Sequence, residues 1–283
     1  MGRAYRAPPE RPGQVAAAAT VGIVQAIRLE RRDQLLIATI DHPTSDMNAV
    51  DQMLHDDFSE LFAQLKREGQ ARAIVLTGGD KRSFSAGGDF AWFPTLRSIE
   101  ALDHLRRVAK QIIWDLLDVE VPIVCALNGS AAGLGASIAL LCDVVVMSDR
   151  ASIVDPHVNV GLVAGDGGAA VWPLLLGPLA AKRHLLLGEP LRADEALRLG
   201  VAAEVCAPDQ VNERAIAWAQ RLADQPPLAV RGTKLAVNAQ LKRALLDSFD
   251  LSMALEIPCF LSHDHAEAVD AITERRAPRY EGR

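Results

Sequence analysis

Cysteine is scarce and dispersed in this chain of 283 residues. The four cysteines, Cys125, Cys142, Cys206 and Cys259, lie far apart, and no pair has the short spacing of a metal-binding motif. Such scattered cysteines argue against a disulfide-stapled secreted domain and against a zinc site. The simplest prediction is a reduced, cytoplasmic protein with no bound metal.

Long apolar runs and basic runs are also missing. No apolar stretch approaches the roughly 18–20 residues that a membrane-spanning helix needs. The net charge of −6, without any basic cluster, argues against nucleic acid as a partner. Residues 1–21 contain arginine and proline and lack the continuous apolar centre of a secretory signal, so a flexible N-terminal extension is predicted there.

The most informative stretch is a turn made almost entirely of small residues. An apolar, strand-like run over 121–127 is followed by the turn Asn128–Gly135, and Ala136–Cys142 has the composition of a short buried helix. A turn so poor in side chains lets a ligand reach the backbone, and the helix start behind it offers free N–H groups. It suits an anion, or an oxygen that becomes one, although tight packing of helix on strand would explain the same pattern.

A second turn of the same kind lies upstream. The strand-like run 72–79 precedes Ser83–Phe90, where Ala86, Gly87 and Gly88 again leave the backbone bare. If the two turns face each other, each can aim one N–H at a single carbonyl oxygen. That arrangement is an oxyanion hole, in which one donor typically contributes ~3–4 kcal/mol to transition-state stabilisation.

Strand and helix patterns alternate up to about residue 160, which predicts a β/α architecture. Two strands are expected between residues 22 and 40, joined at Arg31–Asp33, and amphipathic helices at 50–68 and 98–118. Helices dominate beyond residue 172, with a break at Gly177–Pro178. We therefore expect a core over 22–205 and a helical C-terminal part over 206–283. The core is expected to end with a short helix over 194–200 and a short strand over 201–205. Helices over 209–224 and 228–256 are expected in the C-terminal part.

Several separate motifs resemble the crotonase (enoyl-CoA hydratase/isomerase) superfamily in order and spacing. They are the segments 84–89, 128–137 and 142–146, together with the C-terminal segments 262–269 and 274–283. The resemblance covers about residue 22 to the end. It implies an α/β fold with a crotonase-like ββα spiral core and a C-terminal helical trimerisation part, in an assembly of trimers or pairs of trimers.

The resemblance also implies a site. The oxyanion-hole donors would be the amides of Gly88 and Leu134, and Asp46 and Met47 would lie near the coenzyme A portion of an acyl-CoA substrate. Further substrate contacts would come from Ala86, Gly87, Asp89, Phe90, Gly133 and Ser137. No cofactor is implied beyond the coenzyme A of the substrate.

The catalytic groups depart from the family pattern. Hydratases of this superfamily use two glutamates, and the matching positions here hold Ser137 and His157. His157 and Asp166 are candidates for a base and the group that orients it, because a carboxylate fixes the tautomer of an imidazole and raises its basicity. The alternatives are an N-cap role for Asp166 and a hydrogen-bonded core position for His157.

Three functions fit these residues. The first is an acyl-CoA enzyme that stabilises an enolate, with His157 and Asp166 handling protons. The second is a C–C bond hydrolase of a β-diketone, because segment 155–173 resembles the branch of the family that contains 6-oxocamphor hydrolase. The third is a catalytically idle acyl-CoA-binding protein.

The remaining histidines and the aromatic residues near the first turn have simpler expectations. A solvated loop position is expected for His42, surface positions for His55 and His104, and a packing or capping role for His184. Trp92 and Phe93 either line an acyl pocket or pack in the core.

Overall fold

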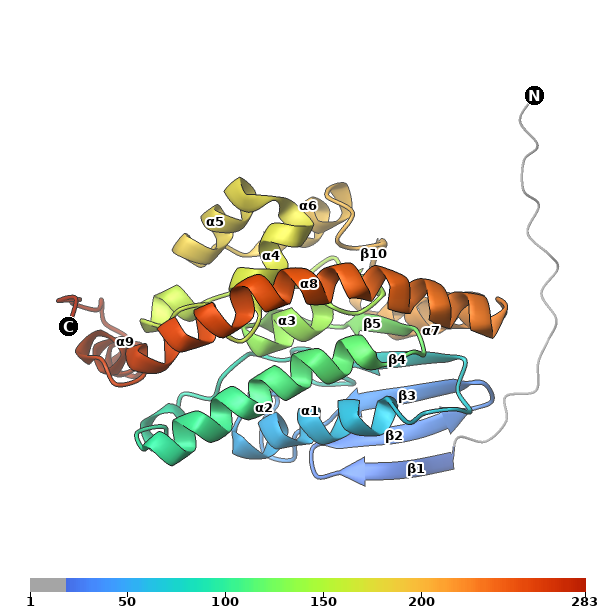
Figure 1. Ribbon diagram of the computed structural model, residues 1–283, viewed down its shortest axis with the longest axis horizontal. Coiled ribbons are helices and arrows are strands. Elements are labelled where there is room, and N and C mark those ends of the chain that lie inside the picture. The colour runs from blue at the N-terminus through green and yellow to red at the C-terminus, as the bar shows by residue number, and fades with distance from the viewer. Residues whose placement is uncertain (1–18) are drawn as a thin grey trace.

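The computed structural model describes residues 19–283 and shows a twisted sheet covered by helices (Figure 1). The flexible extension predicted over 1–21 lies outside the described residues, except for its last three, which begin the first strand, β1 (Ala19–Val24).

The main sheet has seven strands in the order β1-β2-β3-β4-β5-β7-β10. β1, β2 (Ile27–Arg32) and β3 (Leu35–Ile40) form an antiparallel meander, whereas the sequence predicted only two strands before residue 40. β4 (Ala73–Thr77), β5 (Ile123–Leu127), β7 (Val144–Ser148) and β10 (Glu204–Cys206) continue it in parallel. The parallel strands are apolar on both faces because helices cover both.

Two helical layers cover the sheet. On one face lie α1 (Gln52–Leu65) and α2 (Ile99–Asp118), close to the predicted bounds. The opposite face carries α7 (Val211–Ala223), which packs through alanines on β4, β5 and β7. α7 therefore belongs to the core sandwich, although the sequence placed it in the C-terminal part.

A small second sheet carries the turns of interest. β6 (Ala131–Ala132), β8 (Ser152–Val154) and β9 (Leu191–Arg192) form it, and isolated bridges join Val50 to Gly88 and Ser85 to Ala131. Between β6 and β8, α3 (Leu134–Leu140) is entirely buried. Residue 50, the first turn, the second turn and residues 152–154 therefore lie side by side in that order.

The rest of the chain is mostly helical. It comprises the short 3-10 helices η1 (Phe93–Thr95), η2 (His157–Val160) and η3 (Pro208–Gln210), and the helices α4 (Gly168–Leu176), α5 (Pro178–Leu187), α6 (Ala193–Arg198), α8 (Pro227–Cys259) and α9 (His263–Glu274). The break predicted at Gly177–Pro178 separates α4 from α5. Figure 1 shows α8 running alongside α2 across the molecule, and the two helices are in contact.

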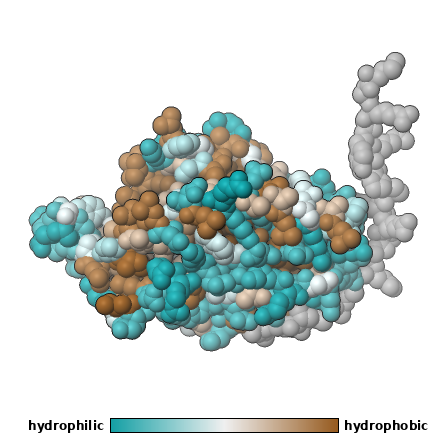
Figure 2. Space-filling model, in the orientation of Figure 1, coloured by the Kyte–Doolittle hydropathy of each residue, from teal (hydrophilic) through white to brown (hydrophobic). Residues whose placement is uncertain are grey.

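Exposed leucines gather on α4 and α5. They are Leu174, Leu175, Leu179, Leu186 and Leu187, and Figure 2 shows brown, hydrophobic atoms where these helices lie in Figure 1. An apolar surface of this kind is typical of subunit contacts, but the trimer expected from the sequence stays a prediction. Among residues 19–283, no helix combines the length and the apolar character that crossing a bilayer requires.

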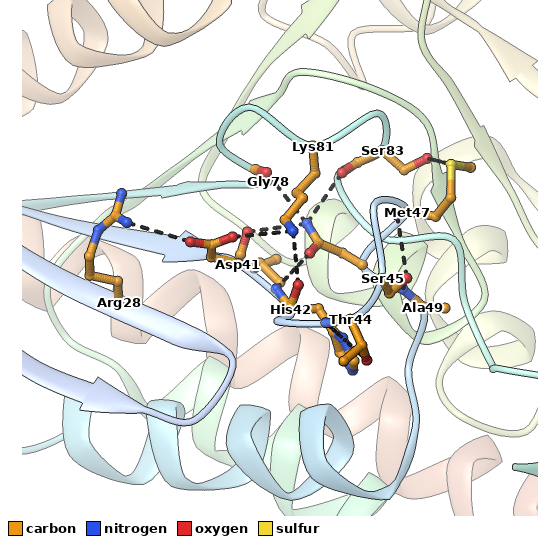
Figure 3. A network of polar contacts seen from close by, with 12 residues as sticks. Arg28, Asp41, His42, Thr44, Ser45, Met47, Ala49, Gly78, Lys81 and Ser83 are labelled. Atoms are coloured by element: carbon orange, nitrogen blue, oxygen red, sulfur yellow. Dashed lines mark hydrogen bonds and ion pairs between the residues drawn. The ribbon is translucent and has the colours of Figure 1, made fainter.

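The first glycine turn is anchored by a buried asparagine. Asn48 has a left-handed backbone (φ 47°) and no exposed surface. Its Nδ2 lies 3.2–3.4 Å from carbonyl oxygens that include those of Gly78, Ser83 and Phe84, and its Oδ1 accepts the His42 N–H at 3.1 Å. Figure 3 shows these surroundings around His42, Gly78 and Ser83. One side chain thus ties the loop before α1 to the segment that begins the turn.

Replacing this asparagine tests the anchor. Asn48→Ala should lower the free energy of unfolding by roughly 2–4 kcal/mol, because it leaves several buried backbone groups without partners. Chemical denaturation monitored by circular dichroism measures the change. Gln70→Ala, at an exposed position in the loop after α1, is the control and should cost less than about 1 kcal/mol. Equal losses for the two variants would contradict the anchoring role.

Candidate active site

The two glycine turns lie against each other. Gly87 and Gly133 both have positive φ angles (77° and 51°), which favour glycine. A Cβ on Gly133 would lie 3.8 Å from the Gly87 Cα, and one on Gly135 would come within 2.6 Å of the Ser85 Cβ. The turns meet through bare backbone, so larger residues at Gly135 would force them apart.

Two backbone amides at this junction are unused. Val50 donates to the Gly87 carbonyl and accepts from the Asp89 N–H, so the Gly88 N–H between them faces the other way. Leu134 is the first residue of α3, where amides have no intrahelical acceptor. Within residues 19–283, neither amide donates to another backbone group. Both residues line one cavity of about 180 Å³.

His157 faces the same cavity and is surrounded by carboxyl groups. It follows β8 and opens η2, and a Cβ on Gly133 would lie 3.5 Å from its Cε1. Its Nδ1 donates to Asp155 Oδ1 at 2.6 Å, and its Nε2 lies 3.4 Å from Asp166 Oδ2. The predicted neighbours His157 and Asp166 therefore do lie together. Asp166 makes no side-chain cap, since α4 begins after Gly167.

Two members of this cluster were not predicted from the sequence. Asp155, although adjacent in the chain, is the closest partner of His157, and Glu256 from α8 places Oε1 3.6 Å from its Nε2. Glu256 had a detectable signal: it lies in the periodic run Phe249, Met253, Glu256, Phe260, whose other members are apolar and buried. Glutamate is almost never fully buried without a partner, so an acid at a core position of a helix indicates a specific role.

Burial and charge act in opposite directions on the cluster. Burial alone disfavours charge on His157, but the carboxylates of Asp155 and Asp166 outweigh it and raise the pKa of His157 well above its usual value. Burial raises the pKa of Glu256 to about 8; the His157 charge opposes the shift, and the Asp166 and Asp155 charges add to it. Near neutral pH, His157 thus tends to hold its proton and Glu256 is largely neutral.

The cluster is compact enough to be considered as a metal site. Ligand atoms of Asp155, His157 and Asp166 lie within 4.8 Å of one another. However, Nδ1 and Nε2 sit on opposite edges of the ring, and Nδ1 is already hydrogen-bonded to Asp155. One ion cannot bind both nitrogens, so the arrangement suits proton transfer better than chelation. The absence of a metal stays a prediction.

The other predicted contact residues divide into two groups. Ala86, Gly87, Phe90, Gly133, Trp92 and Phe93 line the cavity. Ser137 does not: it is fully buried, and its Oγ lies against Gly167. The Asp89 carboxylate is also turned aside, because its Oδ1 accepts the Ala91 N–H at 2.8 Å.

Asp46 and Met47 lie on the exposed outer side of the first turn, away from the cavity lining. Their backbone carbonyls accept the amides of Arg82 and Ala86. Contact of these two residues with coenzyme A stays a prediction.

Two histidines are buried where the sequence predicted exposure. His42 accepts the Thr44 N–H at Nδ1, and its Nε2 lies 3.2 Å from Asp51 Oδ2. His55 lines the cavity, and burial lowers its pKa to about 4. His104 is partly exposed beside Asp56, and the buried His184 bonds to the Glu189 carbonyl as expected.

Comparison with known proteins identifies the family. The model of the family described as "Enoyl-CoA hydratase/isomerase" matches residues 30–283. The chain belongs to the enoyl-CoA hydratase/isomerase family. Its mixed α/β architecture with a helical C-terminal region is accordingly the crotonase fold, as the sequence predicted.

Several relatives of this family member have named activities. It is 32% identical to the (E)-benzylidenesuccinyl-CoA hydratase of Thauera aromatica, over 90% of this chain and 99% of that protein. It is 28% identical to the short-chain-enoyl-CoA hydratase of Clostridium acetobutylicum, over 88% of this chain and 94% of that protein.

Solved structures show the same similarity. An enoyl-CoA hydratase/isomerase from Mycobacterium paratuberculosis is 36% identical with a TM-score of 0.82, covering 87% of this chain and 97% of that one. A β-diketone hydrolase from the cyanobacterium Anabaena, bound to (S)-3-oxocyclohexyl acetic acid, is 30% identical with a TM-score of 0.78, covering 83% and 94%.

The raised pKa of Glu256 has a measurable consequence for stability. The folded state holds this proton more tightly than the unfolded chain, so its contribution is complete below pH 4.5 and is lost as pH rises through about 8. Glu256→Gln should therefore gain roughly 2 kcal/mol relative to the unsubstituted protein between pH 6 and pH 8. Denaturant unfolding at several pH values measures the difference. For Glu60→Gln, exposed on α1, the difference in free energy of unfolding from the unsubstituted protein should be the same at every pH. A difference that is independent of pH for Glu256→Gln would contradict the burial of a protonated acid at this position.

Proposed function

We propose that this protein acts on an acyl-CoA thioester by stabilising its enolate. The thioester oxygen would lie between the amides of Gly88 and Leu134, and His157 with Asp166 would move the proton in place of the usual two glutamates. The observation that carries the proposal is the junction of the turns, where two unused amides flank one cavity beside His157. Preorganised donors of this kind stabilise developing negative charge without reorganisation.

The hydrogen bonds of His157 support a role in proton transfer. Asp155 accepts the Nδ1 proton and so fixes the ring orientation, which leaves Nε2 to exchange a proton with substrate beside Asp166. Because the pKa of His157 is raised, its neutral, basic form becomes more abundant as pH rises above neutrality. The neutral Glu256 beside Nε2 limits the negative charge that the cluster accumulates.

The relatives favour the same substrate class. Hydratases of CoA esters match this chain over nearly its whole length. However, water addition by two glutamates is not available here, because Ser137 is buried outside the cavity and His157 occupies the second position. We therefore propose that the site forms the enolate, and we do not propose that it adds water.

A second candidate is hydrolysis of a β-diketone, favoured by the Anabaena neighbour. Water, deprotonated by His157, would add to one carbonyl, and the C–C bond to the central carbon would then break. The attacked carbonyl would become a carboxylic acid, and the electron pair of that bond would become an enolate held by Gly88 and Leu134. Protonation of the enolate at carbon by the imidazolium of His157 would give a ketone, so a cyclic diketone would yield one keto acid. The hole and the histidine serve both reactions, so binding of coenzyme A decides between them.

Proton exchange at the α-carbon tests the primary proposal. The protein should bind butyryl-CoA, as measured by calorimetry, and catalyse exchange of its α-protons in deuterium oxide, as followed by NMR. His157→Ala should slow exchange by about 10²–10⁴-fold while leaving binding within a few-fold, because it removes the base and not the hole.

His104→Ala is the matched control and should exchange normally. Failure to bind any CoA ester would favour the diketone reaction. Binding without exchange would indicate an idle binding protein.

The role of Asp166 is visible in the pH profile. Asp166→Asn should lower the maximal exchange rate by roughly 10–100-fold. It should also move the rising limb of rate against pH to lower pH, because one carboxylate that stabilises the imidazolium is removed. Asp103→Asn, on the surface of α2, should leave the profile unchanged. A slower variant with an unshifted limb would remove Asp166 from the electrostatics of His157.

A further inference from the structure

A second imidazole faces the cavity from the side opposite His157. His55 lies on α1 with 2% of its surface exposed, and it lines the cavity together with Trp92, Leu96 and Leu105. Its ring centroid is 5.5 Å from that of Trp92. The mechanism proposed above gives this histidine no task.

Neither nitrogen of His55 has a hydrogen-bond partner among the described residues. Nδ1 is completely enclosed and unpartnered, 4.0 Å from Asp56 Oδ1. Nε2 is the ring nitrogen that is not enclosed in this way, so it is the nitrogen that a ligand in the cavity can reach. An enclosed N–H without an acceptor costs more than an enclosed lone pair, which favours the tautomer with the proton on Nε2. The ring therefore presents an N–H donor to the cavity.

Burial keeps this donor uncharged. It lowers the pKa of His55 to about 4; the Asp56 charge opposes the shift and His104 adds to it. The ring lies beside Trp92, and this part of the cavity wall also includes the apolar Leu96 and Leu105. A neutral donor in an apolar wall binds a neutral acceptor, such as a carbonyl or hydroxyl oxygen, in preference to a hydrocarbon chain.

Backbone pairing places His55 away from the reacting atoms. Val50, just before α1, pairs with Gly88; Ser85 pairs with Ala131; and Ala132 pairs with Val154, three residues before His157. His55 and His157 thus stand on opposite flanks of the two turns. An oxygen held between the turns meets His157 on one flank and leaves His55 for another part of the substrate.

We propose that His55 is a specificity-determining residue that donates a hydrogen bond from Nε2 to a second oxygen of the substrate. The group bound in the cavity accordingly carries a keto or hydroxyl oxygen beyond the carbonyl that enters the hole. This inference rests on the proposed enolate-forming site, because the first oxygen must occupy that site for the second to reach His55.

Matched ligands test the proposal. Affinities of acetoacetyl-CoA and butyryl-CoA are measured by calorimetry for the unsubstituted protein, His55→Phe, His55→Gln and the control His104→Phe. His55→Phe should lose about tenfold in affinity for acetoacetyl-CoA and stay within twofold for butyryl-CoA, since only the keto oxygen needs the donor. His55→Gln keeps an N–H donor and should restore most of the difference. His104→Phe should change neither affinity.

A second measurement avoids the risk that His55→Phe misfolds. In protein labelled with ¹⁵N-histidine, the Nε2 resonance of His55, assigned by its loss in His55→Gln, should shift on adding acetoacetyl-CoA but not butyryl-CoA. Equal shifts with both ligands, or an unchanged affinity ratio in a folded His55→Phe, would overturn the proposal.

Failure of the proposed acyl-CoA function gives a different result. If neither CoA ester binds, the function is rejected, and the same comparison is made with cyclohexane-1,3-dione and cyclohexanone. If His55→Phe lowers the affinity for cyclohexane-1,3-dione relative to that for cyclohexanone, the specificity role of His55 is supported for a diketone substrate. If this affinity ratio is unchanged, or if neither cyclic ligand binds, the proposal is overturned.

Discussion

The close backbone contact between the two glycine turns is the constraint on which the site depends. A Cβ at Gly135 would overlap Ser85, and the main chain at Gly133 approaches Gly87. This contact, extended by the Val50–Gly88 and Ala132–Val154 pairings, fixes which residues stand on each flank. The unused amides result from it: strand pairing consumes the N–H groups on one side of the first turn, and the start of α3 leaves Leu134 free. Main-chain donors held by packing do not require a particular side chain, so leucine at 134 is compatible with the arrangement.

The C-terminal part of the chain is tied to this chemistry. Glu256 on α8 lies directly against Gly165, where a Cβ would overlap its carboxyl group, and its Oε1 lies 3.6 Å from His157 Nε2. Burying three acids around one histidine is costly unless charge is shared, because each carboxylate loses its hydration. The cluster avoids part of that cost: His157 holds a positive charge and Glu256 keeps its proton near neutral pH. Removing either group would change the charge state of the others, as expected for coupled titrations.

The sequence predicted the features that depend on local pattern. Apolar runs followed by bare glycine segments marked both turns, and helical spacing marked α1 and α2. The pairing of His157 with Asp166 was predicted through family resemblance, because a separation of nine residues along the sequence does not determine their distance in space. Contacts between distant segments were not predictable in this way. Glu256 reaches the site only through the path of α8, and α7 covers the sheet although the sequence grouped it with the C-terminal helices. The burial of His55 was missed because charged neighbours in sequence suggested a surface position, whereas packing on Trp92 decides its environment.

The two cavity histidines show how environment, and not residue type, assigns chemical roles. Both rings are buried, so desolvation disfavours the charged form of each. At His157, two carboxylates reverse that effect, one of them through a direct hydrogen bond, so the ring holds its proton near neutral pH and becomes a base as pH rises. At His55, the nearest carboxylate is 4.0 Å from a nitrogen to which it is not bonded, and desolvation dominates. One flank of the turns is therefore suited to moving protons. The other can only offer a fixed dipole, which suits it to recognising substrate oxygen without competing for the reaction.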